Sequence, residues 1–354
     1  MATLPSLTES IDDQFVSTWY EIRKDAIDNI LDSNIITAAL REQGCFTPQV
    51  GGRFITRTIK YGTKSSTDIG KGSTLSSGED DIETMAMWTW RYSHTHIQRS
   101  MVDDQVNSGP SAIKSLVATK LQAARDALDT GIETDFTQDN ATASAGAFDA
   151  TSVALEQSHT APQGLFSVTP REANWDASEY YGTILRDSTN TWWRRQGNKD
   201  TAGTGDIWDT PRDIYLLANM RSTFNYCGRG SDFPNLLITD QPTFELYEDF
   251  AEDKTQIIRQ TSTNLANLGF EVLQFKGRPI VWSPTFGTSG YGKAGDMLFL
   301  NTKYIEIVYD PNMWFEMTKW KEIPLQAERI AHIFIAWNMI CSQPRRQGMR
   351  YTTA

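Results

Sequence analysis

The stretch Ser111-Ala-Ile-Lys-Ser-Leu-Val-Ala-Thr-Lys120-Leu-Gln-Ala-Ala-Arg-Asp-Ala-Leu128 is the most regular amphipathic segment of the chain. Ser-Gly-Pro at 108–110 suits a helix start and Gly131 a helix stop, so the predicted helix covers 108–131. At 1.5 Å per residue it is a rod roughly 30 Å long, and we predict that two different regions are arranged across it. Its hydrophobic residues recur three, four and seven positions apart, on one stripe: Ile113, Leu116, Val117, Leu121, Ala124 and Leu128.

Composition bounds the class of protein and its compartment. The chain has 354 residues, 39% of them hydrophobic, so it can bury a large core. It has no apolar run of about 18 residues and no secretory signal at its start, so no membrane span is predicted. Cys45, Cys227 and Cys341 are far apart and odd in number. That pattern favours reduced thiols made in a cytoplasm over disulfides or a zinc site.

The net charge is −11, from 33 basic and 44 acidic residues. A protein that grips nucleic acid by its phosphates usually presents a basic surface, because counterion release drives that binding. The sequence therefore predicts a protein that can lie beside nucleic acid without binding it tightly.

Two strand-like segments, 54–61 and 83–98, precede the long helix, and a further helix is predicted at 10–31. The tip between the strands, 62–82, is rich in Gly, Ser, Thr and Asp and cannot bury a core of its own. Because a long two-stranded arm is only marginally stable in water, we expect another subunit to support it. In the second strand, alternation predicts one shared face for six residues: Ala86, Trp88, Trp90, Tyr92, His94 and His96.

After the long helix, an irregular surface excursion is expected at 137–162. Helices follow at 211–225 and after Asp240. Helices and antiparallel strands are thus segregated along the chain, which predicts an α+β fold. Strands are expected at 236–239, 271–275, 279–282, 297–300, 304–309 and 330–340.

No segment carries a convincing motif for catalysis. Gly287-Thr-Ser-Gly-Tyr-Gly292-Lys293 fits a phosphate-binding loop, but Ala294 stands where that loop needs a hydroxyl, so a glycine-rich turn is the better interpretation. His94 and His96 share a strand face, but no third metal ligand is placed by the sequence. We therefore predict no catalytic, cofactor-binding or metal-binding residues.

Aromatic pairs offer a different kind of surface. Trp192 and Trp193, followed by two arginines, could stack on nucleic-acid bases. In an acidic protein, packing against a neighbouring helix or subunit is the better interpretation, and the same holds for Trp88 and Trp90.

The C-terminal half carries short motifs in a familiar order. Gly269-Phe-Glu-Val-Leu-Gln-Phe-Lys-Gly277-Arg-Pro-Ile-Val-Trp282 is followed by Gly295-Asp-Met-Leu-Phe-Leu-Asn301-Thr-Lys-Tyr-Ile305, and 333–346 closes the series. Phe46-Thr-Pro48, Gly51-Gly52, Tyr181-Gly182 and Trp192-Trp193 precede them in order. Taken as an ordered set over nearly the whole chain, these motifs resemble the major capsid protein of tailed bacteriophages, the Hong Kong 97 fold.

The resemblance implies a domain division for this α+β chain. It consists of an N-terminal arm at 1–50 with the helix 10–31, an extended β-hairpin loop at 51–98, a peripheral domain at 99–164 with the spine helix 108–131, a mainly axial domain of mixed sheet and helices at 165–300, and peripheral-domain strands with the C-terminus at 301–354.

The resemblance also implies a function. The chain would self-assemble into pentamers and hexamers of an icosahedral shell around double-stranded DNA, without enzymatic activity, in a virion made in the host's bacterial cytoplasm. A separate scaffolding protein is implied because the arm helix begins near residue 10, and a portal protein is a further partner. Decoration proteins are left open.

Some family members cross-link a loop lysine to a neighbouring subunit. Lys64 and Lys71 lie in the loop, but no acceptor is matched here, so cross-linking is not expected. Two alternatives stay open: an encapsulin-like compartment of the same fold, and a soluble α+β enzyme binding phosphate through 287–293. The residues predicted to contact other subunits are Lys64, Lys71, Trp88, Trp90, Trp192 and Trp193.

Overall fold

The computed structural model describes residues 34–63, 66, 68–72, 78, 81–102, 116–137, 162–169, 180–186, 190–200, 212–228, 232–253, 273–286, 295–324 and 326–352. The predicted helix at 10–31 and the glycine-rich turn at 287–293 lie outside these ranges, as does most of the surface excursion. Within the described ranges, no helix is both long and apolar enough to cross a membrane.

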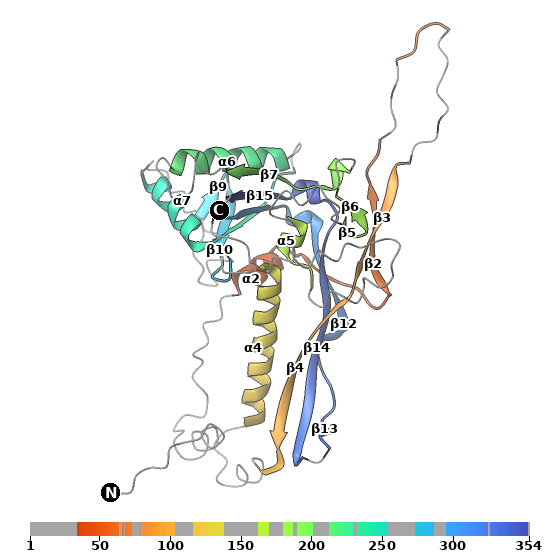
Figure 1. Cartoon of the computed structure of the whole chain (residues 1–354), viewed down its shortest axis with the longest axis vertical. Coiled ribbons are helices and arrows are strands. Elements are labelled where there is room, and N and C mark those ends of the chain that lie inside the picture. The colour runs from red at the N-terminus through yellow and green to blue at the C-terminus, as the bar shows by residue number, and fades with distance from the viewer. Residues whose placement is uncertain are drawn as a thin grey trace.

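A long five-stranded sheet forms the lower body of the molecule (Figure 1). Its central strand, β14 (Glu328–Cys341), pairs with β12 (Ile305–Met317) and β13 (Lys321–Glu322) along one edge and with β4 (Arg91–Ser100) along the other. The end of the central strand nearest the second sheet is buried from Ile335 to Cys341. The fifth strand, β1 (Phe46–Pro48), pairs in parallel with β12.

The spine helix α4, Leu116–Thr137, lies alongside this sheet and packs mainly against β4. The predicted stop at Gly131 is wrong, because the apolar stripe continues past it to Phe136, which packs edge-on against Trp337 of β14 at 5.3 Å. Gly131 faces open space, so its cost of about 1 kcal/mol within a helix is offset by the burial of its neighbours. At this end the stripe therefore contacts β14. Its buried members are Ala124, Leu128, Ile132 and Phe136.

The predicted strand at 83–98 is two strands. Strand β3, Glu83–Thr89, pairs with β2, Phe54–Lys60, in an antiparallel hairpin, whereas β4 leaves the hairpin and pairs with β14. The break at Trp90 reverses which side chains face inward. Ala86 and Trp88 are buried, but Tyr92, His94 and His96 are exposed, so the predicted shared face is wrong beyond the break.

A six-stranded mixed sheet forms the upper body, flanked by helices α6, Arg212–Cys227, and α7, Gln241–Asp253. Strand β15 belongs to this sheet, whereas the prediction grouped it with the peripheral strands of 301–354. Continuous apolar runs make β8 and β11 wholly buried, as expected for interior strands. In spatial order the strands are β7 Gln196–Asp200, β15 Gly348–Thr352, β11 Met297–Leu300, β8 Leu236–Thr239, β10 Arg278–Trp282 and β9 Leu273–Phe275.

Short elements fill the junction between the two bodies. They are α2 Ile35–Glu42, α5 Leu165–Val168, β5 Tyr180–Tyr181, β6 Ile184–Leu185, η6 Thr191–Trp193, η7 Thr302–Tyr304 and η8 Pro344–Arg346.

A buried carboxylate organises this junction. The backbone N–H groups of Ile36 and Thr37 donate to Glu133 of α4 at 2.9 and 2.8 Å, and the Thr37 hydroxyl donates at 2.7 Å. These N–H groups belong to the first turn of α2, where no intrahelical acceptor exists. Glu133 is 2% exposed, and burial raises the pKa of its carboxyl. One side chain therefore joins α2 to the spine helix.

Candidate assembly surfaces

The β2–β3 hairpin projects away from both sheets (Figure 1). Its far end carries Lys71, which is exposed, and Ile69, whose side chain is 65% exposed. Lys64 lies outside the described residues. These exposed side chains are available for contact with another molecule.

The base of the hairpin is firmly held. Ile55 is fully buried, and the Met87 N–H donates to the Gly182 carbonyl at 3.0 Å. A Cβ on Gly182 would lie 2.6 Å from the Trp88 ring, so this close approach requires glycine. An Arg57–Glu306 ion pair at 2.6 Å joins β2 to β12. The projecting tip therefore rises from an ordered base.

Two of the predicted assembly tryptophans are buried inside the subunit. Trp88 is 2% exposed and packs edge-on against Tyr181 at 5.6 Å. Trp193 is 1% exposed, and its Nε1–H donates to the Tyr181 carbonyl at 2.9 Å. Within the single subunit, these two side chains are therefore covered by their own chain.

The other two tryptophans lie at the surface. Trp90 is half-buried and donates from Nε1 to the Gly52 carbonyl at 2.9 Å. Trp192 is half-buried and stacks on Tyr61 at 5.0 Å, with 21° between the ring planes. Trp90, Trp192 and Lys71 therefore remain candidates for contact with a neighbouring subunit.

A cleft of about 210 Å³ opens where the hairpin base meets the six-stranded sheet. Four separate chain segments build it, which is why no sequence pattern could have revealed it. In the part of the chain that the structure describes, its lining contains three cations and several aromatic rings but no carboxylate. We call it the basic aromatic cleft, and its defining side chains are Lys60, Tyr61, Trp192, Tyr226, Arg345 and Arg346.

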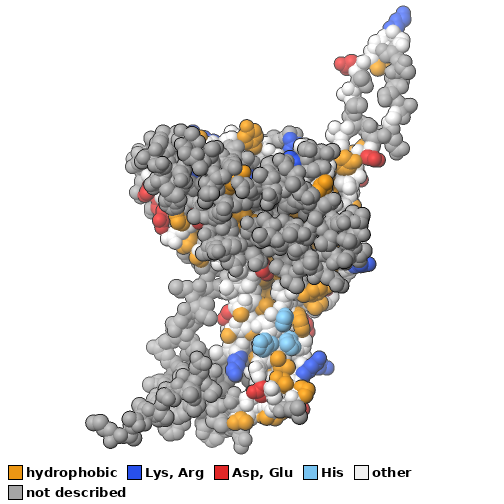
Figure 2. Space-filling view, in the orientation of Figure 1, with side chains coloured by type: hydrophobic (Ala, Val, Ile, Leu, Met, Phe, Trp, Pro, Cys, Tyr) orange, Lys and Arg blue, Asp and Glu red, His pale blue; other side chains and the backbone are white. Residues whose placement is uncertain are grey.

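The histidines form a third surface. His94 and His96 of β4 lie beside His332 of β14, with ring centroids 6.0 and 6.4 Å from the His332 ring. Figure 2 shows the histidines together on the open face of the long sheet. Among the described residues, no three potential ligands are grouped so that they could hold a metal ion.

The three cysteines do not form a nucleophilic site. Cys45, Cys227 and Cys341 are free and buried, and burial raises the pKa of each thiol to about 12. Each is therefore a neutral thiol at physiological pH, whereas the nucleophile of cysteine chemistry is the thiolate. Such thiols act as small packing groups.

No family profile and no curated protein sequence matches the chain. Solved structures do. A capsid subunit of cyanophage A-1(L) is 16% identical, with a TM-score of 0.59 over 95% of this chain and 98% of that one. The capsid of a native GTA particle gives 10% identity and a TM-score of 0.56, over 99% of this chain and 100% of that one. The SrpI encapsulin complex of Synechococcus elongatus gives 10% and 0.53, over 98% and 95%.

These subunits define a class of proteins that share one shell-forming fold. The chain has this fold, the fold of tailed-phage major capsid proteins, over nearly its whole length. The resemblance inferred from the short ordered motifs is therefore confirmed at the level of the fold.

Proposed function

We propose that this protein is the major capsid protein of a tailed bacteriophage, assembling into the pentamers and hexamers of an icosahedral shell around double-stranded DNA. The observation that carries the proposal is the match in fold to a cyanophage capsid subunit, which extends over 95% of this chain and 98% of that subunit. The projecting hairpin also supports the proposal, because a free-standing subunit does not need such an element.

In this proposal, the long sheet with α4 is the peripheral domain, the six-stranded sheet with α6 and α7 is the axial domain, and β2–β3 is the extended loop. A scaffolding protein and a portal protein are its assembly partners, and the virion is its final location. The net charge of −11 suits a wall that encloses DNA without trapping it. The protein has no catalytic role.

Shell stability in this proposal comes from repetition. A standard protein–protein interface buries about 1,600 Å² in total, and many such weak contacts in a closed shell reinforce one another. The hairpin tip and the basic aromatic cleft are the surfaces of this subunit best suited to such contacts.

Electron microscopy of the purified protein, alone and co-expressed with its neighbouring genes, tests the proposal. We expect closed shells of uniform size. An unassembled protein that hydrolyses nucleotide, with the activity lost in Lys293→Ala, would instead favour a phosphate-binding enzyme.

An encapsulin-like compartment is the second candidate, because the SrpI encapsulin matches with a TM-score of 0.53 over 98% of this chain. The two candidates differ in what the shell holds. Double-stranded DNA in purified particles, with terminase and portal genes nearby, supports the phage capsid. A co-purifying cargo enzyme supports the compartment.

A further inference from the structure

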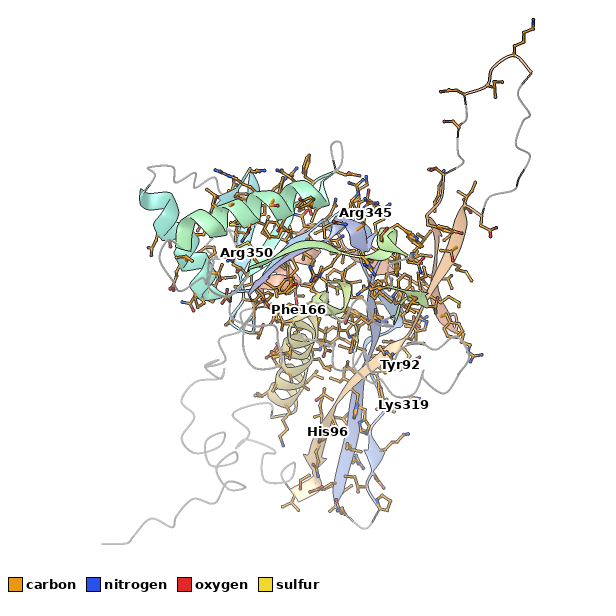
Figure 3. All side chains as sticks on the ribbon, turned by 45° about the horizontal axis from the view of Figure 1, so that its top comes forward. Tyr92, His96, Phe166, Lys319, Arg345 and Arg350 are labelled. Atoms are coloured by element: carbon orange, nitrogen blue, oxygen red, sulfur yellow. The ribbon has the colours of Figure 1, made fainter. Side chains whose placement is uncertain are left out.

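The basic aromatic cleft and helix α7 lie at opposite ends of the six-stranded sheet. Helix η8 of the cleft ends two residues before Gly348. Gly348 pairs with Phe299 of β11, which lies beside Leu237 near the start of β8. Helix α7 begins just after Thr239, at the other end of the same strand. In Figure 3, Arg345 lies on the side of the upper body nearest the hairpin. In Figure 1, α7 lies at the edge of the upper body farthest from the hairpin.

The cleft has an excess of positive charge. Lys60 and Arg345 are exposed, and Arg346 is half-buried. The neighbouring carboxylate of Asp232, which does not line the cleft, accepts a hydrogen bond from Tyr304 at 2.6 Å and pairs with the Lys303 ammonium. Asp232 also interacts electrostatically with Arg346. Among the described residues, the lining of the cleft contains Lys60, Arg345 and Arg346 and no carboxylate, so its charge is positive.

Aromatic rings give the cleft an apolar floor. Tyr61 and Trp192 stack at 5.0 Å, and Tyr226 beside them is 63% exposed. Tyrosine, tryptophan and arginine are the residues enriched in protein–protein interfaces. The combination indicates a contact surface for an acidic partner with some apolar surface.

Helix α7 has the complementary character. Its sequence, Gln-Pro-Thr-Phe-Glu-Leu-Tyr-Glu-Asp-Phe-Ala-Glu-Asp, contains carboxylates but no lysine or arginine. Glu245 and Asp249 are exposed and four residues apart, so they lie on one face of the helix. Figure 2 shows acidic side chains along this edge of the molecule.

We propose that the basic aromatic cleft of each subunit receives helix α7 of the adjacent copy. Two different, complementary patches at opposite ends of the six-stranded sheet can make a head-to-tail contact between copies, and such contacts generate rings when the rotation closes. The inference rests on the proposed shell function and deepens it by naming a contact within each ring.

Single-stranded nucleic acid is the competing occupant, since aromatic rings with lysine and arginine also suit bases and phosphates. The chain carries a net charge of −11 and supplies its own acidic helix, so a second copy is favoured.

Paired charge reversals test the contact. Lys60→Glu with Arg345→Glu reverses the cleft, and Glu245→Lys with Asp249→Lys reverses the helix. Because like charges placed across an interface repel, each double variant should lower the yield of shells at least about tenfold. Combining all four substitutions should restore the yield to within about threefold of wild type, because the attraction is re-formed with the signs exchanged.

A matched control separates this contact from net charge. Lys319→Glu with Lys321→Glu makes the same charge change as the cleft variant, at exposed positions in and just before β13 of the long sheet. Its shell yield should stay near that of wild type, and all variants should keep the melting temperature of the unassembled subunit. An equal loss in the control would mean that net charge governs yield, and would overturn the inference.

Disulfide trapping provides a second measurement. Subunits with Tyr226→Cys and subunits with Glu245→Cys are mixed, assembled and oxidised with diamide. Covalent dimers are expected only in the mixture. The native cysteines do not compete, because burial raises the pKa of each thiol to about 12.

The outcomes separate the two proposals. Shells that form without trapped dimers overturn the α7 contact and leave the capsid function standing. A wild-type protein that forms no shell under any condition overturns both. Protection of the Tyr226→Cys thiol by a single-stranded oligonucleotide, with no trapped dimers, assigns the cleft to nucleic acid and also overturns the contact.

Discussion

The long sheet with its spine helix and the β2–β3 hairpin are both extended, yet they are stabilised differently. Strand β14 has partners on both edges and ends in a fully buried run, and α4 adds Phe136 against Trp337. Over its described residues, the hairpin consists of one strand pair, and its buried side chains lie at the base. The comparison separates what folds the subunit from what is left for a neighbour.

Removing packing from the body should have the largest effect on the subunit. Phe136→Ala leaves a cavity against Trp337 and should lower the free energy of unfolding by about 3–5 kcal/mol. Urea unfolding of the unassembled subunit measures this. Ala123→Ser, at an exposed position of the same helix, is the control and should be nearly neutral. Equal stability of Phe136→Ala and wild type would mean that this helix end is not packed as described.

The junction should be the next most sensitive place. Glu133→Ala leaves the N–H groups of Ile36 and Thr37 buried without their acceptor, at a cost of about 1–3 kcal/mol each. Glu133→Gln keeps one acceptor oxygen, so it should lose less. Hydrogen exchange of these two amides in the unassembled subunit reports the effect locally. Unchanged exchange in Glu133→Ala would show that α2 is capped by another group.

Asp135, on the same helix, should make stability depend on pH. Burial raises the pKa of its carboxyl to about 7, so the folded state binds this proton more tightly than the unfolded chain, whose Asp pKa is about 3.9. The resulting stabilisation is present at pH values below about 4 and is lost as the pH rises towards 7. In Asp135→Asn, unfolding measured across this range should show a shallower decline. An unchanged slope would assign the pH dependence to Glu133, whose pKa is raised in the same direction.

Shortening the hairpin should have the smallest effect on the subunit and a complete effect on assembly. Replacing 63–81 with Asn-Gly keeps the hydrogen bond from the Tyr61 N–H to the Ile82 carbonyl within reach of a tight turn. The unfolding free energy should change by less than about 0.5 kcal/mol, as for surface changes elsewhere, while closed shells disappear from electron micrographs. A length-matched Gly-Ser tip tests whether reach or sequence matters. Normal shells from the shortened chain would remove the hairpin from the assembly proposal.

Local sequence was informative where burial is continuous or where a helix is bounded by strong signals. The segments 236–239 and 297–300 form the strands predicted for them, because a short apolar run bounded by chain breakers is typical of a fully buried strand. The helix predicted at 211–225 corresponds to α6, Arg212–Cys227, within two residues at each end.

The features that the sequence did not predict depend on contacts between residues far apart in the chain. The helix extends past Gly131 because Phe136 packs against Trp337, a residue far along the chain. Alternation continues through Trp90, so only the pairing with β14 reveals where the hairpin ends. The basic aromatic cleft draws on four chain segments, and no pattern within any one of them predicts it.

The reversal at Trp90 has a consequence for how such chains can diverge. Before the break, even-numbered residues such as Ala86 and Trp88 are buried. After it, odd-numbered residues face inward, ending with Ile97, which is 3% exposed. A single-residue insertion or deletion between 89 and 91 would turn β4 over and bury its histidines. Insertions and deletions in relatives should therefore accumulate at the hairpin tip, where they do not change which side chains of β4 face inward. They should be absent from the segment around Trp90.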